Sequence, residues 1–137
     1  MAAVGYSGTP LAKKLGLKDG MRVWFDAMPG SVREEIAKAG VVLSDEIVPT
    51  PGIHAAHIFV TERADMEQKL ALLRKLIDPS GFVWVSWPKK SSKRPTDITD
   101  DVMRAVILPA TDWVDVKVCA VDDVWSGLKL VVRKASR

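Results

Sequence analysis

The sequence predicts a single α/β domain of the three-layer, Rossmann-like class, with a mostly parallel sheet that ends in a C-terminal antiparallel hairpin. Short apolar runs alternate with segments of helical periodicity between residues 21 and 109. Repeated strand–helix–strand units of this kind give a parallel sheet with helices on both faces. The 137 residues suit one domain, residues 1–137, in which residues 1–8 are expected to form a flexible N-terminal arm.

The first half of the chain is expected to supply a short helix and then a strand–turn–helix unit. Thr9-Pro10 is typical of an N-cap followed by the first helical residue. Residues 21–25 are apolar enough for a strand that is buried on both faces. Ser31 and Glu34 have the spacing of a capping box, which predicts that a helix begins after Ser31. Residues 41–48 then predict a strand interrupted by polar residues.

The middle of the chain continues the alternation of strands and helices. Residues 57–60 predict a short buried strand, and residues 63–77 carry apolar side chains at helical spacing. Residues 82–87 predict the next strand. A third long helix is expected from Thr99, whose side chain can cap it, to a stop at Pro109.

The end of the chain predicts a hairpin at one edge of the sheet. In residues 114–118 and 128–132, valine and leucine alternate with charged side chains, which is the pattern of two half-buried antiparallel strands. An edge strand offers unpaired backbone groups, so a homodimer through this edge is one expectation.

Composition excludes several classes of function. A single cysteine, Cys119, rules out an internal disulfide and a cysteine-based metal cluster. His54 and His57 have no third ligand nearby in the sequence, so no metal is expected. A net charge of +3 is too small for a dedicated nucleic-acid binder. No apolar run reaches the roughly 20 residues of a membrane span, and no secretory signal is evident, so we expect a cytoplasmic protein.

Polar side chains follow three of the predicted parallel strands, where ligands bind in open α/β sheets. The segments after Phe25, Val60 and Val85 are expected to face one crevice. The candidate ligand-binding residues are Asp26, Arg63, Trp87, Lys89, Lys90, Ser91 and Ser92. These cations, hydroxyls and an indole suit a small anionic ligand better than nucleophilic catalysis, so no catalytic residue is assigned.

The basic loop at residues 88–95 carries four cations and two hydroxyls ahead of a helix N-terminus, which favours a phosphate or carboxylate. A solvated surface loop explains the same charges equally well. Asp97, Asp100 and Asp101 follow at once and argue against an extended phosphate backbone as the partner.

The turn at residues 26–31 is short of glycine. A nucleotide cofactor needs close backbone approach and free N–H groups, whereas this turn has one Gly, and its Pro29 has no N–H. No cofactor is therefore expected. Asp26 either binds a hydroxyl or an amine of a ligand, or caps the turn.

Two resemblances follow from these residues. The order of elements resembles a shortened class I methyltransferase-like sheet, although that family implies a glycine-rich turn after the first strand and an acidic residue at the end of the second, for which Asp45-Glu46 is a poor match. Nearly the full length also resembles a family of small bacterial proteins of unknown function, in the segments Gly5-Tyr6-Ser7-Gly8-Thr9-Pro10-Leu11-Ala12-Lys13-Lys14-Leu15-Gly16, Trp87-Pro88-Lys89-Lys90 and Val118-Cys119-Ala120-Val121-Asp122-Asp123-Val124-Trp125-Ser126-Gly127-Leu128.

The sequence alone therefore favours a non-enzymatic binding or regulatory module whose cationic crevice takes a small anionic ligand or an acidic patch on a partner protein. Two alternatives remain open. One is a divergent S-adenosylmethionine-dependent methyltransferase-like enzyme, which the topology allows. The other is a weak nucleic-acid binder, which only the basic loop and the pI near 9.1 support.

Overall fold

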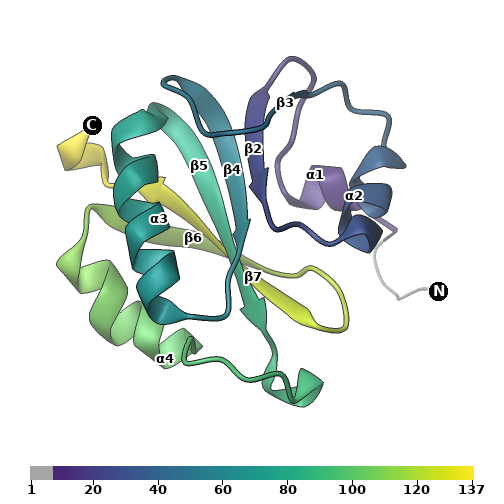
Figure 1. Ribbon diagram of the computed structural model, residues 1–137. Helices are drawn as coiled ribbons and strands as arrows, with labels where there is room; N and C mark the ends of the chain where they lie inside the picture. Colours follow the sequence, from purple (N-terminus) through teal and green to yellow (C-terminus); the bar gives the residue numbers. More distant parts are fainter. Residues whose placement is uncertain (1–7) are drawn as a thin grey trace.

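The computed structural model describes residues 8–137, so most of the expected N-terminal arm lies outside the described residues. A six-stranded sheet with the order β3-β2-β4-β5-β7-β6 forms the centre, and helices pack on its two faces (Figure 1). The strands are β2 (Arg22–Asp26), β3 (Ser44–Glu46), β4 (Ile53–Phe59), β5 (Ile77–Pro88), β6 (Trp113–Ala120) and β7 (Trp125–Val132). The helices are α1 (Leu11–Lys14), α2 (Gly30–Ala37), α3 (Arg63–Leu76) and α4 (Asp100–Val102), with short 3-10 turns at Lys90–Ser92 and Lys134–Ser136.

The sheet is mixed in the predicted way. Strands β3, β2, β4 and β5 are parallel, and β7 lies antiparallel to both β5 and β6. The C-terminal hairpin therefore forms one edge, with β6 outermost. These pairings confirm the predicted α/β fold class with a mostly parallel sheet.

Each face of the sheet has its own apolar core. Trp24, Ile58 and Val85 pack with α3 in one cluster, whereas Val23 and Phe59 pack with α1 and α2 in the other. Two tryptophan indoles on strands donate hydrogen bonds to the helical layers. Trp84 Nε1 donates to the Leu15 carbonyl just after α1 at 2.8 Å, and Trp113 Nε1 donates to the Leu70 carbonyl of α3 at 3.3 Å.

Helix α2 differs from the prediction at its start. It begins at Gly30 with Pro29 as the N-cap, and no side chain caps it. The predicted capping box at Ser31 is therefore wrong, because Ser31 already lies within the first turn. The Pro29 carbonyl instead accepts from the N–H groups of Val32 and Arg33 at 3.0 and 3.1 Å.

Strand lengths also differ from the prediction. The strand expected over residues 41–48 has only three residues, and β4 begins earlier than expected, at Ile53. Strand β5 begins at Ile77, and its register with β4 shifts before Phe82. Gly81 lies in this irregular stretch, where an added Cβ would overlap the His54 carbonyl and lie 3.0 Å from that of Asp78. The glycine is required there for close packing of two backbones.

The third predicted helix forms, but not as a regular α-helix. The Thr99 hydroxyl accepts from the Val102 N–H at 3.1 Å, which confirms the predicted cap. After α4 the helix widens into a π-helix at Met103–Ile107 and tightens into a 3-10 turn at Leu108–Ala110. Pro109 lies in that last turn, at the predicted stop.

Candidate functional site

The carboxyl ends of β2, β4 and β5 lie at the same edge of the sheet, where the chain leaves toward α2, toward α3 and into the segment before α4 (Figure 1). The strand order reverses between β2 and β4, since β3 follows on one side of β2 and β4 lies on the other. Such a switch point is the usual ligand site of an open α/β sheet. The three segments chosen from the sequence thus meet at one edge.

In the turn from β2 to α2, Ala27 adopts a backbone conformation that glycine usually provides. Ala27 has a φ of +54°, in the left-handed region that costs a residue with a Cβ about 1–2 kcal/mol. Gly30 opens α2, and nothing lies within 4 Å of the position that its Cβ would take. The space in front of the helix is therefore open at Gly30.

Asp26 is held by a lysine of α3. Its carboxylate forms an ion pair with the ammonium of Lys69, which also contacts Asp65 at 3.0 Å. Burial opposes the charge on Lys69, but the hydrogen bonds to Asp26 and Asp65 outweigh it and raise the pKa of Lys69. The side chains of Asp26 and Lys69 are only 23% and 25% exposed, so the pair is largely buried where β2 ends.

A second carboxylate lies at the end of the neighbouring strand. Glu46 pairs with Trp24 across β3 and β2, so it shares a face with Trp24 and with Asp26 two residues further along β2. Glu46 accepts from the Thr50 hydroxyl at 2.9 Å and lies 3.7 Å from the Arg22 guanidinium. Glu46, one of the two acidic residues considered for this position, thus lies on the same face of the sheet as Asp26.

Arg63 and Trp87 lie at the predicted edge but contact the protein itself. The Arg63 N–H donates to Asp97 at 2.6 Å, and its guanidinium contacts Glu67 at 3.3 Å. Trp87 is 7% exposed and packs in the core beneath α3. Its indole therefore packs in the core instead of facing solvent.

The basic loop is anchored instead of loose. The Lys89 N–H donates to the Val124 carbonyl at 2.7 Å, and the Ser92 hydroxyl donates to the Lys89 carbonyl at 2.7 Å. Lys90 and Ser91 are exposed. The role of these residues in binding a ligand stays a prediction.

A buried contact between a histidine and a serine lies deeper in the sheet, and no sequence pattern predicted it. His57 on β4 and Ser86 on β5 are 2% and 0% exposed, and the His57 Nε2 lies 2.7 Å from the Ser86 hydroxyl. Burial lowers the pKa of His57 to about 3. Its Nδ1 is buried and has no hydrogen-bond partner within residues 8–137.

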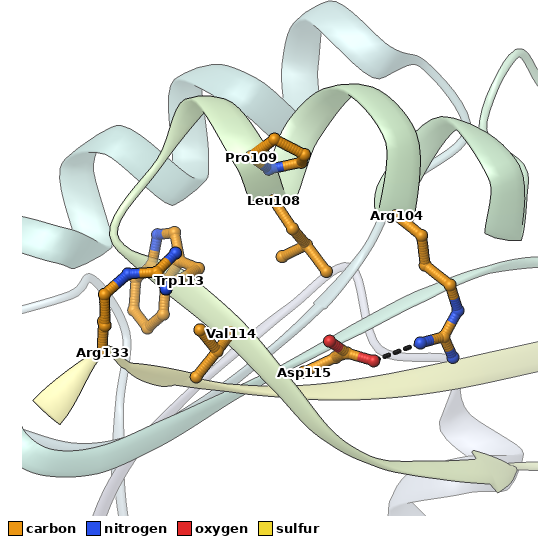
Figure 2. A pocket seen from close by; sticks show the side chains of 7 residues that line it. All are labelled: Arg104, Leu108, Pro109, Trp113, Val114, Asp115 and Arg133. Atoms are coloured by element: carbon orange, nitrogen blue, oxygen red, sulfur yellow. Dashed lines mark hydrogen bonds and ion pairs between the residues drawn. The ribbon is translucent and has the colours of Figure 1, made fainter.

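A shallow hollow of about 300 Å³ lies away from this edge, where β6 begins and β7 ends (Figure 2). An ion pair between Arg104 and Asp115 spans one side of it. The hollow is lined by Arg104, Leu108, Pro109, Trp113, Val114, Asp115 and Arg133.

Within the described part of the chain, no group of three or more acidic, histidine or cysteine side chains is placed to hold a metal ion. Nor does any described helix have the length and apolar character needed to cross a membrane.

Comparison with known proteins identifies the fold. No protein-family model and no curated protein sequence matches the chain. Among solved structures, a methyltransferase dependent on S-adenosylmethionine from Aquifex aeolicus matches with a TM-score of 0.56 at 16% identity, covering 89% of this chain and 88% of that one. Magnesium protoporphyrin IX methyltransferase from Synechocystis PCC 6803 has a TM-score of 0.59 at 12% identity, covering 90% and 74%.

Fibrillarin from Aeropyrum pernix, solved with natively bound S-adenosyl-L-methionine, matches with a TM-score of 0.51 at 10% identity over 90% of this chain and 69% of that one. These neighbours contradict the expectation of a non-enzymatic binding or regulatory module and favour the methyltransferase-like alternative. The expectation was wrong because it took the missing glycines as decisive, whereas Ala27 holds the turn in a left-handed conformation. The chain therefore has the methyltransferase-like Rossmann fold.

Proposed function

We propose that this protein is a methyltransferase-like enzyme that binds S-adenosylmethionine at the switch point between β2 and β4. The observation that carries the proposal is the pair of carboxylates, Asp26 and Glu46, on one face at the ends of adjacent parallel strands. The fold shared with methyltransferases supports the choice of cofactor. When bound, S-adenosylmethionine supplies an electrophilic methyl group on a positively charged sulfur.

The residue types at this edge fit the polar groups of the cofactor. Its ribose hydroxyls and its ammonium group donate hydrogen bonds, which the carboxylates of Asp26 and Glu46 accept. The open space at Gly30 leaves room in front of α2. The turn conformation at Ala27 does not have to be created on binding, because it exists already.

One contact competes with a ligand for Asp26, at its oxygen Oδ2. The ammonium of Lys69 competes for that carboxylate, and it repels a cationic sulfonium at the same edge. Asp65 gives Lys69 an alternative partner on its own helix at 3.0 Å. Lys69 can therefore release Asp26 and still have one carboxylate partner, Asp65.

The predicted residues of the neighbouring segments are assigned to the methyl acceptor in this proposal. Lys90 and Ser91 are exposed on the anchored loop after β5, and Lys89 precedes them. Arg63 begins α3 at the same edge. Their cations and hydroxyls suit an acceptor that carries negative charge.

Calorimetric titration with S-adenosylhomocysteine tests the proposal through two substitutions with opposite effects. Asp26→Asn is expected to weaken binding about tenfold or more, since hydrogen bonds to a charged group are worth about 1.5–3 kcal/mol. Lys69→Met is expected to tighten binding, because it removes the competing ammonium. Asp101→Asn, an exposed carboxylate at the start of α4, is the control and should leave the affinity unchanged.

The proposal fails if neither the wild-type protein nor Lys69→Met binds S-adenosylhomocysteine at millimolar concentration. It also fails if Asp26→Asn and the Asp101→Asn control bind equally well. Circular dichroism of each variant shows whether a loss of binding reflects a loss of fold.

A further inference from the structure

The face of the C-terminal hairpin beside α1 carries two lysines directly opposite each other. Lys117 on β6 pairs with Lys129 on β7 in the antiparallel register. The Lys117 ammonium donates to the Lys14 carbonyl at 3.3 Å, and the Lys129 ammonium lies 4.3 Å from the centre of the Phe82 ring. Like charges facing each other across two strands destabilise a sheet.

The partners of these two lysines do not neutralise them. A carbonyl at the end of α1 and an aromatic ring each attract a cation, but neither carries a negative charge. Among the ion pairs of the described residues, none involves Lys18, Lys117 or Lys129. Burial lowers the pKa of Lys129, and the positive charges of Lys117 and Lys18 lower it further. We call Lys18, Lys117 and Lys129 the lysine cluster.

The positive charge of this face extends toward the edge of the sheet where β2, β4 and β5 end. Cys119 on β6 lies in the field of Lys14, Lys117 and Lys89, and Lys89 begins the loop that follows β5. The lysines do not make this thiol a nucleophile, because burial outweighs them and raises the pKa of Cys119. Activation of the cysteine therefore does not explain the accumulation of charge.

We propose that the lysine cluster binds a ligand that carries clustered phosphate groups. Several ammonium groups that have no carboxylate partner repel one another, and a multivalent anion removes that repulsion while accepting their hydrogen bonds. A single carboxylate offers one charge, whereas a triphosphate or two successive phosphates of a nucleic-acid strand offer several. This site lies on the hairpin, apart from Asp26 and Glu46, and does not depend on the proposed cofactor.

A purely structural role is the rival explanation. In that case Lys117 and Lys129 only cap α1 and cover Phe82, and phosphate compounds act through general screening of charge. The two explanations differ in whether the effect of a polyphosphate depends on these particular lysines at constant ionic strength.

The test is calorimetric titration of the full chain with inorganic tripolyphosphate at fixed ionic strength, without S-adenosylhomocysteine. Lys117→Gln combined with Lys129→Met is expected to weaken binding about a hundredfold, or about tenfold for each lysine removed. The matched control is Lys75→Gln combined with Lys134→Gln, two exposed lysines outside the cluster. This control removes the same charge and should change the dissociation constant less than twofold.

A single Lys18→Gln variant provides a second measurement at an exposed position, and about a tenfold loss is expected. A parallel titration with a twelve-nucleotide single-stranded oligouridylate distinguishes the two sources of phosphate. Binding of tripolyphosphate alone assigns a small ligand, and tighter binding of the oligonucleotide assigns a nucleic-acid strand. Equal weakening by the cluster and control variants, or absence of binding to both probes, overturns the proposal and leaves the proposed cofactor site unaffected.

Discussion

Acid should destabilise this protein through His57. The folded state holds the imidazole neutral down to its pKa of about 3, whereas the unfolded chain takes up a proton near the ordinary value of 6.5. Between these two pH values the unfolded state binds more protons, so stability falls as the pH falls from 6.5 toward 3. Each pH unit in this window costs about 1.4 kcal/mol.

The size of the effect follows from the same two values. At pH 5, which is 1.5 units below the ordinary pKa of 6.5, protonation of His57 stabilises the unfolded state by about 2 kcal/mol. At pH 7.5 the term is close to zero. Such a loss is a large share of the total stability of a typical domain, about 5–15 kcal/mol.

Urea unfolding at pH 7.5 and pH 5, for wild type and His57→Gln, isolates this term. Glutamine cannot take up a proton, yet it can still hydrogen-bond the Ser86 hydroxyl. The advantage of wild type over the variant should shrink by about 2 kcal/mol between the two pH values. If both proteins lose the same stability on acidification, His57 is not held neutral and the reasoning is wrong.

Substitutions at three further positions test the backbone and the cap of α4, each by thermal or urea unfolding. Gly81→Ala should destabilise by more than about 2 kcal/mol, because its Cβ would overlap the His54 carbonyl; a change below 0.5 kcal/mol would contradict the close packing of β4 and β5. Ala27→Gly should stabilise by about 0.5–1 kcal/mol, because it relieves the positive φ; destabilisation would show that the turn is not strained. Thr99→Ala should cost about 1 kcal/mol through the lost cap of α4, while Thr99→Ser should retain most of the stability.

The parallel part of the sheet could be predicted because its signal is local. Buried strands such as Val23 to Phe25 are runs of apolar residues, and α3 repeats its apolar residues at helical spacing. The start of α2 could not be predicted in the same way. The same residues are compatible with a capping box at Ser31 and with an N-cap at Pro29. The backbone conformation of the turn decides between the two.

The contacts of the candidate site could be predicted only in part. The carboxyl ends of parallel strands meet at one edge whatever their sequence, so the position of Asp26, Arg63 and the loop after β5 at that edge could be predicted. Their binding of a ligand stays a prediction. The ion pair between Asp26 and Lys69 joins a strand to a helix far along the chain, and neither residue indicates the other. That Glu46 shares a face with Asp26 could not be predicted, because it depends on the register of β3 against β2.

The outer strand of the hairpin is interrupted. The register of β6 against β7 shifts between Asp115 and Lys117, so the free edge of β6 is not one continuous row of donors and acceptors. A second copy that docked there would need an irregularity at the same place, or could pair with only a few residues on either side of it. The irregularity thus limits open-ended stacking of chains into fibres, and a dimer built through this edge would need contacts beyond the backbone to persist.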